Sequence, residues 1–378
     1  MLDSKKTLYR HQFAIIWFVS SLAFRLLMLP HYLMQVAGRD AWLSMLVLTL
    51  IEVALFYLVY KVTERSSIID FKIIKHIKIG VLLVVSALAV FRILLFLSEA
   101  MDFVSANLLD ESVWTFAMLA LLLAAFYIGY KGGNVLARLA EMVFIFLIIA
   151  VGLALLTFRT DMQWNNILPI MPYGSGDMWR AVDRHWIWFI DLTPLLFLSL
   201  APRKKDKDKV SVPIFMVISV VVSVLFMVFF IAVYGNFGAY VPHALLSFSS
   251  FTIGGGLSGL MFPLIICWVM CAVIQLSLLF NVVVDSATFV TKKRLPSAIG
   301  VFVGIFILMV FFGGVEPTRT ASTSAMRIVF LTLEFVVPVL LVALLVYTIK
   351  KGGVTSNGKS DSGEAEQAET ATGEKVEA

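Results

Sequence analysis

Long apolar runs, separated by short polar segments, follow one another along the chain from about residue 13 to residue 349. Each run approaches the ~20 apolar residues that a helix needs to cross a bilayer. Backbone polar groups in lipid must bond within their own segment, so such runs predict helices, and the weak period-two alternation argues against a barrel. The predicted spans are 13–37, 41–61, 79–106, 113–130, 136–158, 183–201, 212–234, 258–284, 296–313 and 327–349. The pattern therefore predicts an all-α integral membrane protein of about ten transmembrane helices.

The polar loop PRKKDKDKV, at residues 202–210, separates the predicted spans into two halves of five. Residues 351–378 are rich in Gly, Ser, Thr and Glu and hold too few large apolar residues to form a core. The predicted organisation is a cytoplasmic N-terminus at 1–12, a first five-helix repeat at 13–158, an extracytoplasmic loop at 159–182, a second five-helix repeat at 183–350 and a disordered cytoplasmic tail at 351–378.

The lysines and arginines are distributed unevenly between the loops on the two sides of the membrane. Of the 30 residues, 22 lie in one alternating set of loops and 6 in the other, while Arg25 and Arg92 lie inside predicted spans. Cytoplasmic loops carry the excess of positive charge in membrane proteins. We therefore expect a multi-pass protein of the cell membrane with both termini in the cytoplasm.

The composition excludes several other classes of protein. Apolar residues make up 60% and charged residues 15% of the chain, which is far from a soluble domain. The net charge of +5 reflects loop charges that orient the spans, so we expect no nucleic-acid partner. Cys267 and Cys271 lie one turn apart in an apolar run, which predicts buried thiols. We expect no metal, no cofactor and no enzymatic activity, because no catalytic motif is present.

Charged residues inside the predicted spans are the strongest candidates for a functional site. Each costs at least ~2.5–3.5 kcal/mol at a helix centre and is by default a site candidate. At about 1.5 Å rise per residue, Arg25, Arg92 and Glu52 lie roughly 17–20 Å deep, near the midplane. We predict an intramembrane charge network of Arg25, Glu52, Arg92, Glu99, Asp191 and Glu334. The alternative for each charge is a structural ion pair that locks the bundle.

Two prolines interrupt the first span of each half at matching positions, Pro30 in span one and Pro194 in span six. Broken helices at matching positions of two repeats indicate a midplane ligand site in transporter folds. We place that site between spans one, three, six and eight, where Arg25 would meet a carboxylate and Asp191 an amine. The predicted ligand-binding residues are Arg25, Leu29, Pro30, Arg92, Phe96, Asp191, Thr193 and Pro194.

Four stretches of the sequence resemble one known family, the B subunits of spore germinant receptors. They are LPHYLMQVAGRDAWLS at 29–44, GYKGGNVLARLAEMVF at 129–144, NILPIMPYG at 166–174 and ICWVMCAVIQLSLLF at 266–280. The resemblance extends from about His11 to Lys350, and GRDAWLS is its most specific part.

The resemblance implies membership of the amino acid–polyamine–organocation superfamily, with a LeuT-like fold of two inverted five-helix repeats whose helices one and six are broken. It also implies a place in the inner membrane of the spore. There the chain would assemble with a receptor A subunit and a lipoprotein C subunit. A small nutrient, such as an amino acid, would bind and trigger germination.

The resemblance leaves two roles for Arg25 and three for the chain. Relatives have a glycine-rich unwound segment where this chain has Ala23-Phe24-Arg25, so Arg25 either binds the ligand carboxylate or fills the pocket. The leading function is a nutrient-sensing receptor subunit. The alternatives are an amino-acid permease, with the coupling ion left open, and a purely structural subunit that binds no nutrient.

Overall fold

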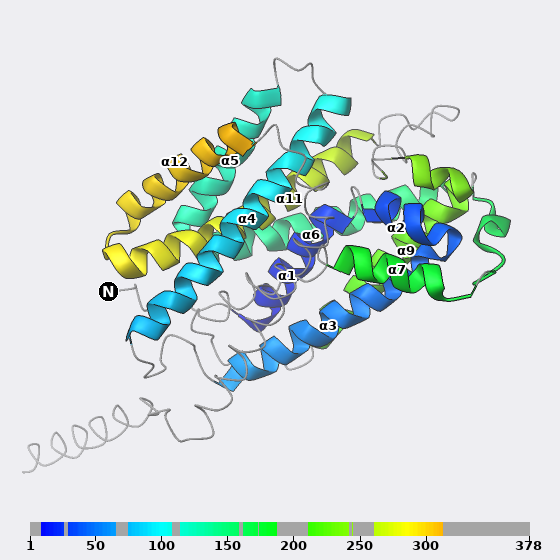
Figure 1. The fold of residues 1–378 in the computed structure, drawn as a ribbon, viewed down its shortest axis with the longest axis horizontal. Helices are drawn as coiled ribbons and strands as arrows, with labels where there is room; N and C mark the ends of the chain where they lie inside the picture. The colour runs from blue at the N-terminus through cyan, green and yellow to red at the C-terminus, as the bar shows by residue number, and fades with distance from the viewer. Residues whose placement is uncertain are drawn as a thin grey trace, which may run out of the picture.

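The computed structural model describes residues 9–25, 29–65, 75–107, 114–158, 162–172, 174–186, 211–241, 244 and 261–312, and all regular structure in them is helical (Figure 1). The α-helices are α1 (Arg10–Arg25), α2 (Leu29–Ala37), α3 (Ala41–Arg65), α4 (Lys75–Asn107), α5 (Trp114–Lys131), α6 (Gly133–Phe158), α7 (Gly176–His185), α9 (Ser211–Tyr234), α11 (Met261–Thr291) and α12 (Arg294–Phe312). Short 3₁₀ turns are η1 (Gly38–Asp40), η3 (Trp164–Ile167) and η5 (Gly235–Tyr240). These helices match predicted spans one to five and seven to nine. Span six from residue 187 onward, span ten and the predicted tail lie outside the described residues.

The first predicted span is two helices rather than one. Helix α1 ends at Arg25 and α2 begins at Leu29, so Pro30 is the second residue of α2. A proline is tolerated in the first turn of a helix, but its ring clashes with the carbonyl four residues earlier. For Pro30 that residue is Leu26, the first one after α1. The structure describes the first predicted span as two helices, and Pro30 lies in the first turn of the second.

Helix α11 lies at the centre of the helices that the structure describes. It packs against α1, α4, α5, α6 and α12. Of its apolar segment, 61% is buried, against 22% for the peripheral α12. Most residues of the main hydrophobic core come from α1, α4, α5, α6 and α11, and α3, α9 and α12 add a few more, which explains why α11 is apolar on nearly every side.

A second packing group surrounds the first span. Helix α9 packs against both α1 and α3, while α2 packs against α3 and α7. Helices α2 and α7 lie together at one end of the molecule, as Figure 1 shows. A separate hydrophobic cluster with Leu29, Met45 and Phe230 holds α2, α3, α7 and α9 together. The break between α1 and α2 thus lies where the two packing groups meet.

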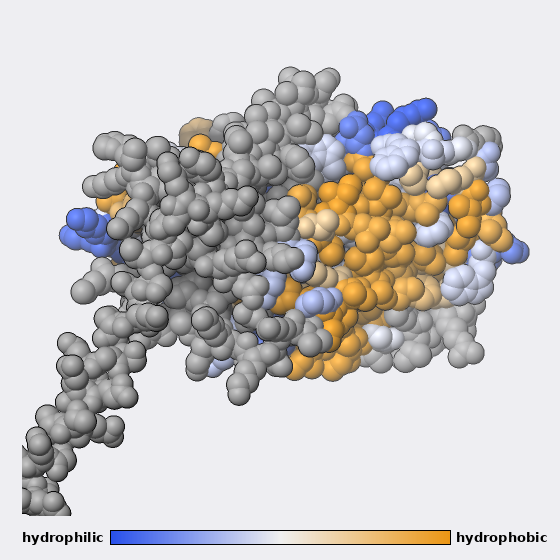
Figure 2. All heavy atoms as spheres, turned by 90° about the horizontal axis from the view of Figure 1, so that it is seen from below, coloured by the Kyte–Doolittle hydropathy of each residue, from blue (hydrophilic) through white to orange (hydrophobic). Residues whose placement is uncertain are grey.

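Large apolar side chains cover much of the outer surface. Figure 2 shows a broad apolar area on one face, with hydrophilic residues at its edges. Examples with half or more of the side chain exposed are Ile145 on α6, Val217 on α9 and Phe311 on α12. Within the described residues, six helical segments are long and apolar enough to cross a membrane. Such a surface is stable only against lipid, so this is a multi-pass membrane protein.

Helix α7 was not predicted, because it lies at the end of the segment taken as an extracytoplasmic loop. Its sequence GDMWRAVDRH has only a narrow apolar stripe, made of Met178, Ala181 and Val182. All three are buried, and the helix packs against α2 and α3. Ten residues with a short apolar stripe give no span signal, so this helix depends on its tertiary contacts.

Candidate ligand and ion site at the break of the first span

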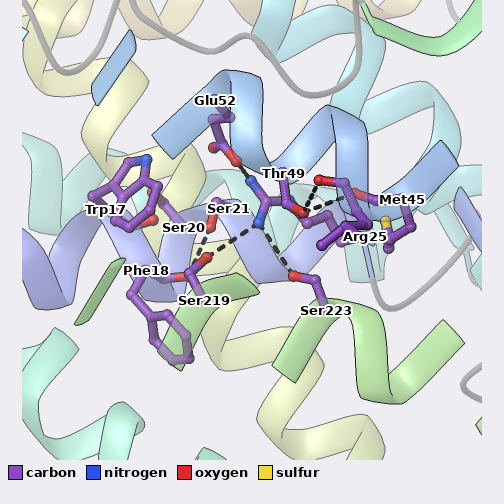
Figure 3. Close-up of polar contacts among 11 residues, drawn as sticks. Trp17, Phe18, Ser20, Ser21, Arg25, Met45, Thr49, Glu52, Ser219 and Ser223 are labelled. Atoms are coloured by element: carbon purple, nitrogen blue, oxygen red, sulfur yellow. Dashed lines mark hydrogen bonds and ion pairs between the residues drawn. The ribbon is translucent and has the colours of Figure 1, made fainter. Parts of the chain in front are cut away.

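Arg25, the last residue of α1, is the centre of a buried polar cluster (Figure 3). Its Nη2 forms an ion pair with Oε2 of Glu52 on α3. Its Nη1 donates to Oγ of Ser219 and of Ser223 on α9, each at 3.3 Å. Arg25 is 1% and Glu52 2% exposed. We call these four residues the Arg25 cluster; it joins three helices at the point where the first span breaks.

Further aromatic and polar groups lie near the cluster along α1 and α3. The rings of Trp17 and Phe56 stack with centroids 4.1 Å apart. Trp17 lies about two turns before Arg25 on α1, and Phe56 lies about one turn after Glu52 on α3. The hydroxyl of Thr49 donates to the carbonyls of Met45 at 2.7 Å and Leu46 at 3.0 Å, so its hydrogen bonds stay within α3. The guanidinium is therefore surrounded by protein and contacts carboxylate and hydroxyl oxygens.

The charges of the Arg25 cluster balance one another. A single buried charge is very unfavourable, and a buried pair is tolerated when it is close and its remaining groups are hydrogen-bonded. Here the carboxylate neutralises the guanidinium and two hydroxyls accept further hydrogen bonds. Arg25 also lies at the C-terminal end of α1, where the helix dipole favours a positive charge.

The geometry bears on the two roles that the sequence left for Arg25. A ligand carboxylate would have to compete with Glu52, which already pairs with the guanidinium. This arrangement favours the role in which Arg25 fills the pocket next to the break. The same contact identifies a partner within the predicted charge network, since Arg25 and Glu52 were both placed there from the sequence.

The other predicted residues of the first span, Leu29 and Pro30, are buried at the start of α2. Leu29 belongs to the hydrophobic cluster that also contains Met227 and Phe230 of α9. Its side chain is therefore enclosed by apolar packing. Any ligand contact at these two residues would have to come from the backbone at the start of α2.

Arg92, Phe96 and Glu99 lie on one face of α4, as their spacing of four and three residues requires. Their exposed fractions are 8%, 5% and 3%, so two charged groups are buried together with an aromatic ring. Phe96 belongs to the main core, and α4 packs against α11, which also contacts α1. The structure thus places this face and the Arg25 cluster on helices that share α11 as a neighbour.

The remaining predicted site residues are Asp191, Thr193, Pro194 and Glu334, and all four lie outside the described residues. The predicted contact between Asp191 and a ligand amine therefore stays a prediction, as does the break in span six. Within the described part of the chain, no group of three or more His, Cys, Asp and Glu side chains is arranged to hold a metal ion.

A second polar arrangement involves the GRD motif of η1, which we call the GRD clasp. Arg39 donates from Nε to Oδ1 of Asn236 at 2.9 Å and from Nη1 to the carbonyl of Leu168 at 2.7 Å. Oδ1 of Asp40 accepts a hydrogen bond from the backbone N–H of Met171 at 2.9 Å. Met171 has a φ of +51°, which side-chain-bearing residues rarely adopt. The motif therefore links residues 168–171 to η5.

A third polar arrangement, the Arg294 knot, joins the ends of α5, α11 and α12. Arg294 donates from Nε to the carbonyl of Tyr130 at 2.9 Å, and its Nη1 lies 3.2 Å from Oδ1 of Asp285. Nδ2 of Asn281 donates to the carbonyl of Gly129 at 3.1 Å. The knot therefore joins the last turn of α5 to α11 and to the first residue of α12, and the charge pattern assigns the loops next to these helix ends to the same side of the membrane.

Ser219 and Ser223 are the residues that sequence reasoning missed. A signal was present, because two serines four residues apart form a polar stripe on an otherwise apolar helix. Such a stripe in a membrane helix indicates an interhelical hydrogen-bond partner. The sequence did not tell which of the intramembrane charges would face it.

Comparison with solved structures supports the architecture, and 42 solved chains match. The structure of MhsT in complex with L-phenylalanine matches with a TM-score of 0.59 and 14% sequence identity. The match covers 90% of this chain and 99% of MhsT. No curated protein sequence matches the chain. The helices and the broken first span therefore define a membrane protein with the LeuT-like fold of a transporter.

The family follows from the sequence match. The model of the spore permease family, described as spore germination protein, matches residues 7–314. The chain belongs to this family. The resemblance inferred from GRDAWLS and the three other stretches is confirmed, and so is the LeuT-like fold that it implied.

Proposed function

We propose that this chain is the membrane subunit of a spore germinant receptor that senses a small nutrient, amino-acid-like in chemistry, and triggers germination. The observation that carries the proposal is the match to the spore germination family over residues 7–314. A transporter-like fold whose first span is broken beside buried charge supports nutrient binding, because such breaks create sites near the midplane. The protein acts without catalysing a reaction.

In this proposal the nutrient binds beside the α1–α2 break, between the first span, α4, α11 and the sixth span. A ligand triggers a response only through unequal affinity for two conformations of the protein. In this proposal the two conformations differ at the break, where the Arg25 cluster joins α1 to α3 and α9. Asp191 remains the candidate partner of a ligand amine. Receptor A and lipoprotein C subunits complete the receptor in the spore inner membrane, with both termini of this chain cytoplasmic.

The test is germination of spores that lack this gene, measured against a panel of single amino acids and sugars. We expect the response to one nutrient to be lost and to be restored by the wild-type gene. Phe96→Leu, on the buried face of α4, is expected to raise the nutrient concentration for half-maximal germination several-fold. Phe311→Leu, on the lipid-facing side of α12, is the matched control and should leave it unchanged.

Normal germination of the deletion strain on every nutrient would overturn the receptor proposal. Loss of the response, with no Phe96 variant changing the dose dependence or the nutrient preference, would place the chain as a structural subunit instead. Immunoblots of spore membranes must show equal amounts of each variant, so that a shift reports binding rather than assembly.

The second candidate function is an amino-acid permease. The similarity to MhsT favours it, because that protein was crystallised with L-phenylalanine and has the same fold. The measurement is uptake of labelled amino acids into proteoliposomes that contain only this chain. Accumulation above that of empty liposomes, abolished by excess unlabelled amino acid, would establish transport. A result equal to empty liposomes would exclude transport by the isolated chain.

A further inference from the structure

The oxygen atoms around Arg25 form the kind of environment that binds a small cation. One carboxylate and two hydroxyls, from α3 and α9, converge on one guanidinium at the C-terminal end of α1. Hard cations in proteins take carboxylate, hydroxyl and carbonyl oxygens as ligands. The C-terminal end of a half-helix adds the negative end of its dipole. Arg25 thus occupies a position that the surrounding atoms would otherwise offer to a free ion.

Within the described residues, the cluster brings one carboxylate, that of Glu52, to one positive charge, that of Arg25. Arg25 and Glu52 are both almost completely buried, and their formal charges cancel. A second cation in this place would be a buried charge without a counterion, which is strongly unfavourable. With Arg25 present, the carboxylate and the hydroxyls are therefore not available to an ion from solution.

We infer that the Arg25 guanidinium is a tethered cation that permanently fills a monovalent-cation site formed by Glu52, Ser219 and Ser223. The closed packing of α1, α3 and α9 then needs no ion such as Na⁺ at this position. Removal of the guanidinium turns the cluster into a real ion site. The inference concerns the ion requirement of the chain and does not depend on which nutrient it senses.

The consequence for a variant follows from charge balance. Arg25→Ala leaves the Glu52 carboxylate buried beside two hydroxyls, with the space of the guanidinium open to water. Na⁺ has the charge and the preference for oxygen ligands that this space requires. An ion that binds the folded chain and not the unfolded chain raises the unfolding temperature in a saturable way. The variant should therefore become sodium-dependent where the wild type is not.

The experiment measures thermal unfolding of the purified full-length chain in nanodiscs. NaCl replaces choline chloride stepwise at constant total salt concentration. We expect the unfolding temperature of the wild type to be the same throughout. Arg25→Ala should unfold several degrees lower in choline chloride and recover saturably with Na⁺. The double variant Arg25→Ala/Glu52→Gln should show no recovery, because the carboxylate that holds the ion is gone.

Arg180→Ala is the matched control, since Arg180 pairs with Asp177 at 3.3 Å with its side chain 71% exposed. It should show no sodium dependence. Arg25→Gln, which keeps a polar side chain without charge, is measured in the same way as a second variant. A saturable Na⁺ effect on the wild type would overturn the inference. The same holds for Arg25 variants that are insensitive to Na⁺, or that aggregate even when purified in NaCl.

Discussion

The Arg25 cluster and the GRD clasp are both built around an arginine, but they differ in burial and in the charge of the groups that accept its hydrogen bonds. Arg25 is buried among three helices and is matched by a carboxylate. Arg39 is partly exposed and is matched only by the neutral oxygens of Asn236 and Leu168. Water can share in solvating Arg39, whereas Arg25 has only the protein. A charge at depth therefore needs a counter-charge, and a charge at the surface can organise loops with neutral acceptors.

This difference predicts two kinds of failure. The Arg25 cluster joins α1, α3 and α9, so its loss should destabilise the whole bundle. The GRD clasp joins residues 168–171 to η1 and η5, so its loss should release that region while the bundle stays folded. The following variants test this distinction, and the expected effect decreases from each to the next.

Glu52→Ala is expected to have the largest effect. It leaves the Arg25 guanidinium buried without a counter-charge, which costs about 3–5 kcal/mol of unfolding free energy. Glu52→Ala/Arg25→Met removes both charges and should recover most of that loss, since an apolar pair of similar volume is tolerated. The measurement is the thermal unfolding of the purified chain. Equal stability of the single and the double variant would show that the pair is not coupled.

Asp40→Ala should have an intermediate effect that is confined to the clasp. It removes the acceptor of the Met171 N–H, at a cost of about 1–3 kcal/mol. Limited proteolysis should then cut the 163–174 segment faster, with little change in global unfolding. Asp40→Asn keeps an oxygen acceptor and is the matched control. Cleavage at the wild-type rate in Asp40→Ala would contradict the role of this hydrogen bond.

Arg39→Ala is expected to cost about 1 kcal/mol, because its two hydrogen bonds are partly exposed to water. The same proteolysis assay should detect it as a smaller increase than that of Asp40→Ala. Arg39→Lys can replace one of the two donors, so its rate of cleavage should lie between the rates of Arg39→Ala and the wild type. An effect of Arg39→Ala as large as that of Glu52→Ala would remove the distinction between the two sites.

Ser219→Ala and Ser223→Ala should have the smallest effects. Hydrogen bonds between membrane helices contribute about 0.6 kcal/mol on average, and both bonds here are long at 3.3 Å. The ion pair with Glu52 remains in each variant and keeps Arg25 neutralised. Thermal unfolding of the two single variants and the double variant measures the contribution. A loss of several kcal/mol from one serine would mean that the hydroxyls, and not the carboxylate, determine the cluster.

Much of the fold could be predicted from sequence because the bilayer restricts the options so strongly. Apolar length alone located α3, α4, α5, α6, α9 and α12 within four residues, whereas α11 continues to Thr291, seven residues beyond the predicted end of its span. Pro30 located the break, because the proline ring excludes a helical carbonyl four residues before it. The short helix α7 escaped, since its ten residues lack the apolar length on which that reasoning depends.

The site was only partly predictable, for a physical reason. Arg25 and Glu52 stood out because charges in apolar runs are costly, but the choice of partner depends on how α1, α3 and α9 are rotated. Ser219 and Ser223 carry no charge and therefore drew no notice. The GRD motif stood out only by resemblance, because hydrogen bonds to distant backbone groups, such as the N–H of Met171, leave no periodic pattern in the sequence.

The contact between α5 and α11 at Gly129 has a mechanical meaning. A methyl group there would lie 2.9 Å from Cβ of Phe280 and 2.9 Å from the carbonyl of Ser277, so the two backbones meet with no clearance. Surfaces that interlock so closely cannot slide past each other. Arg294 also joins α12 to α5 and α11, so these three helices pack as one unit. A movement that opens or closes the protein would then leave α5, α11 and α12 in place relative to one another.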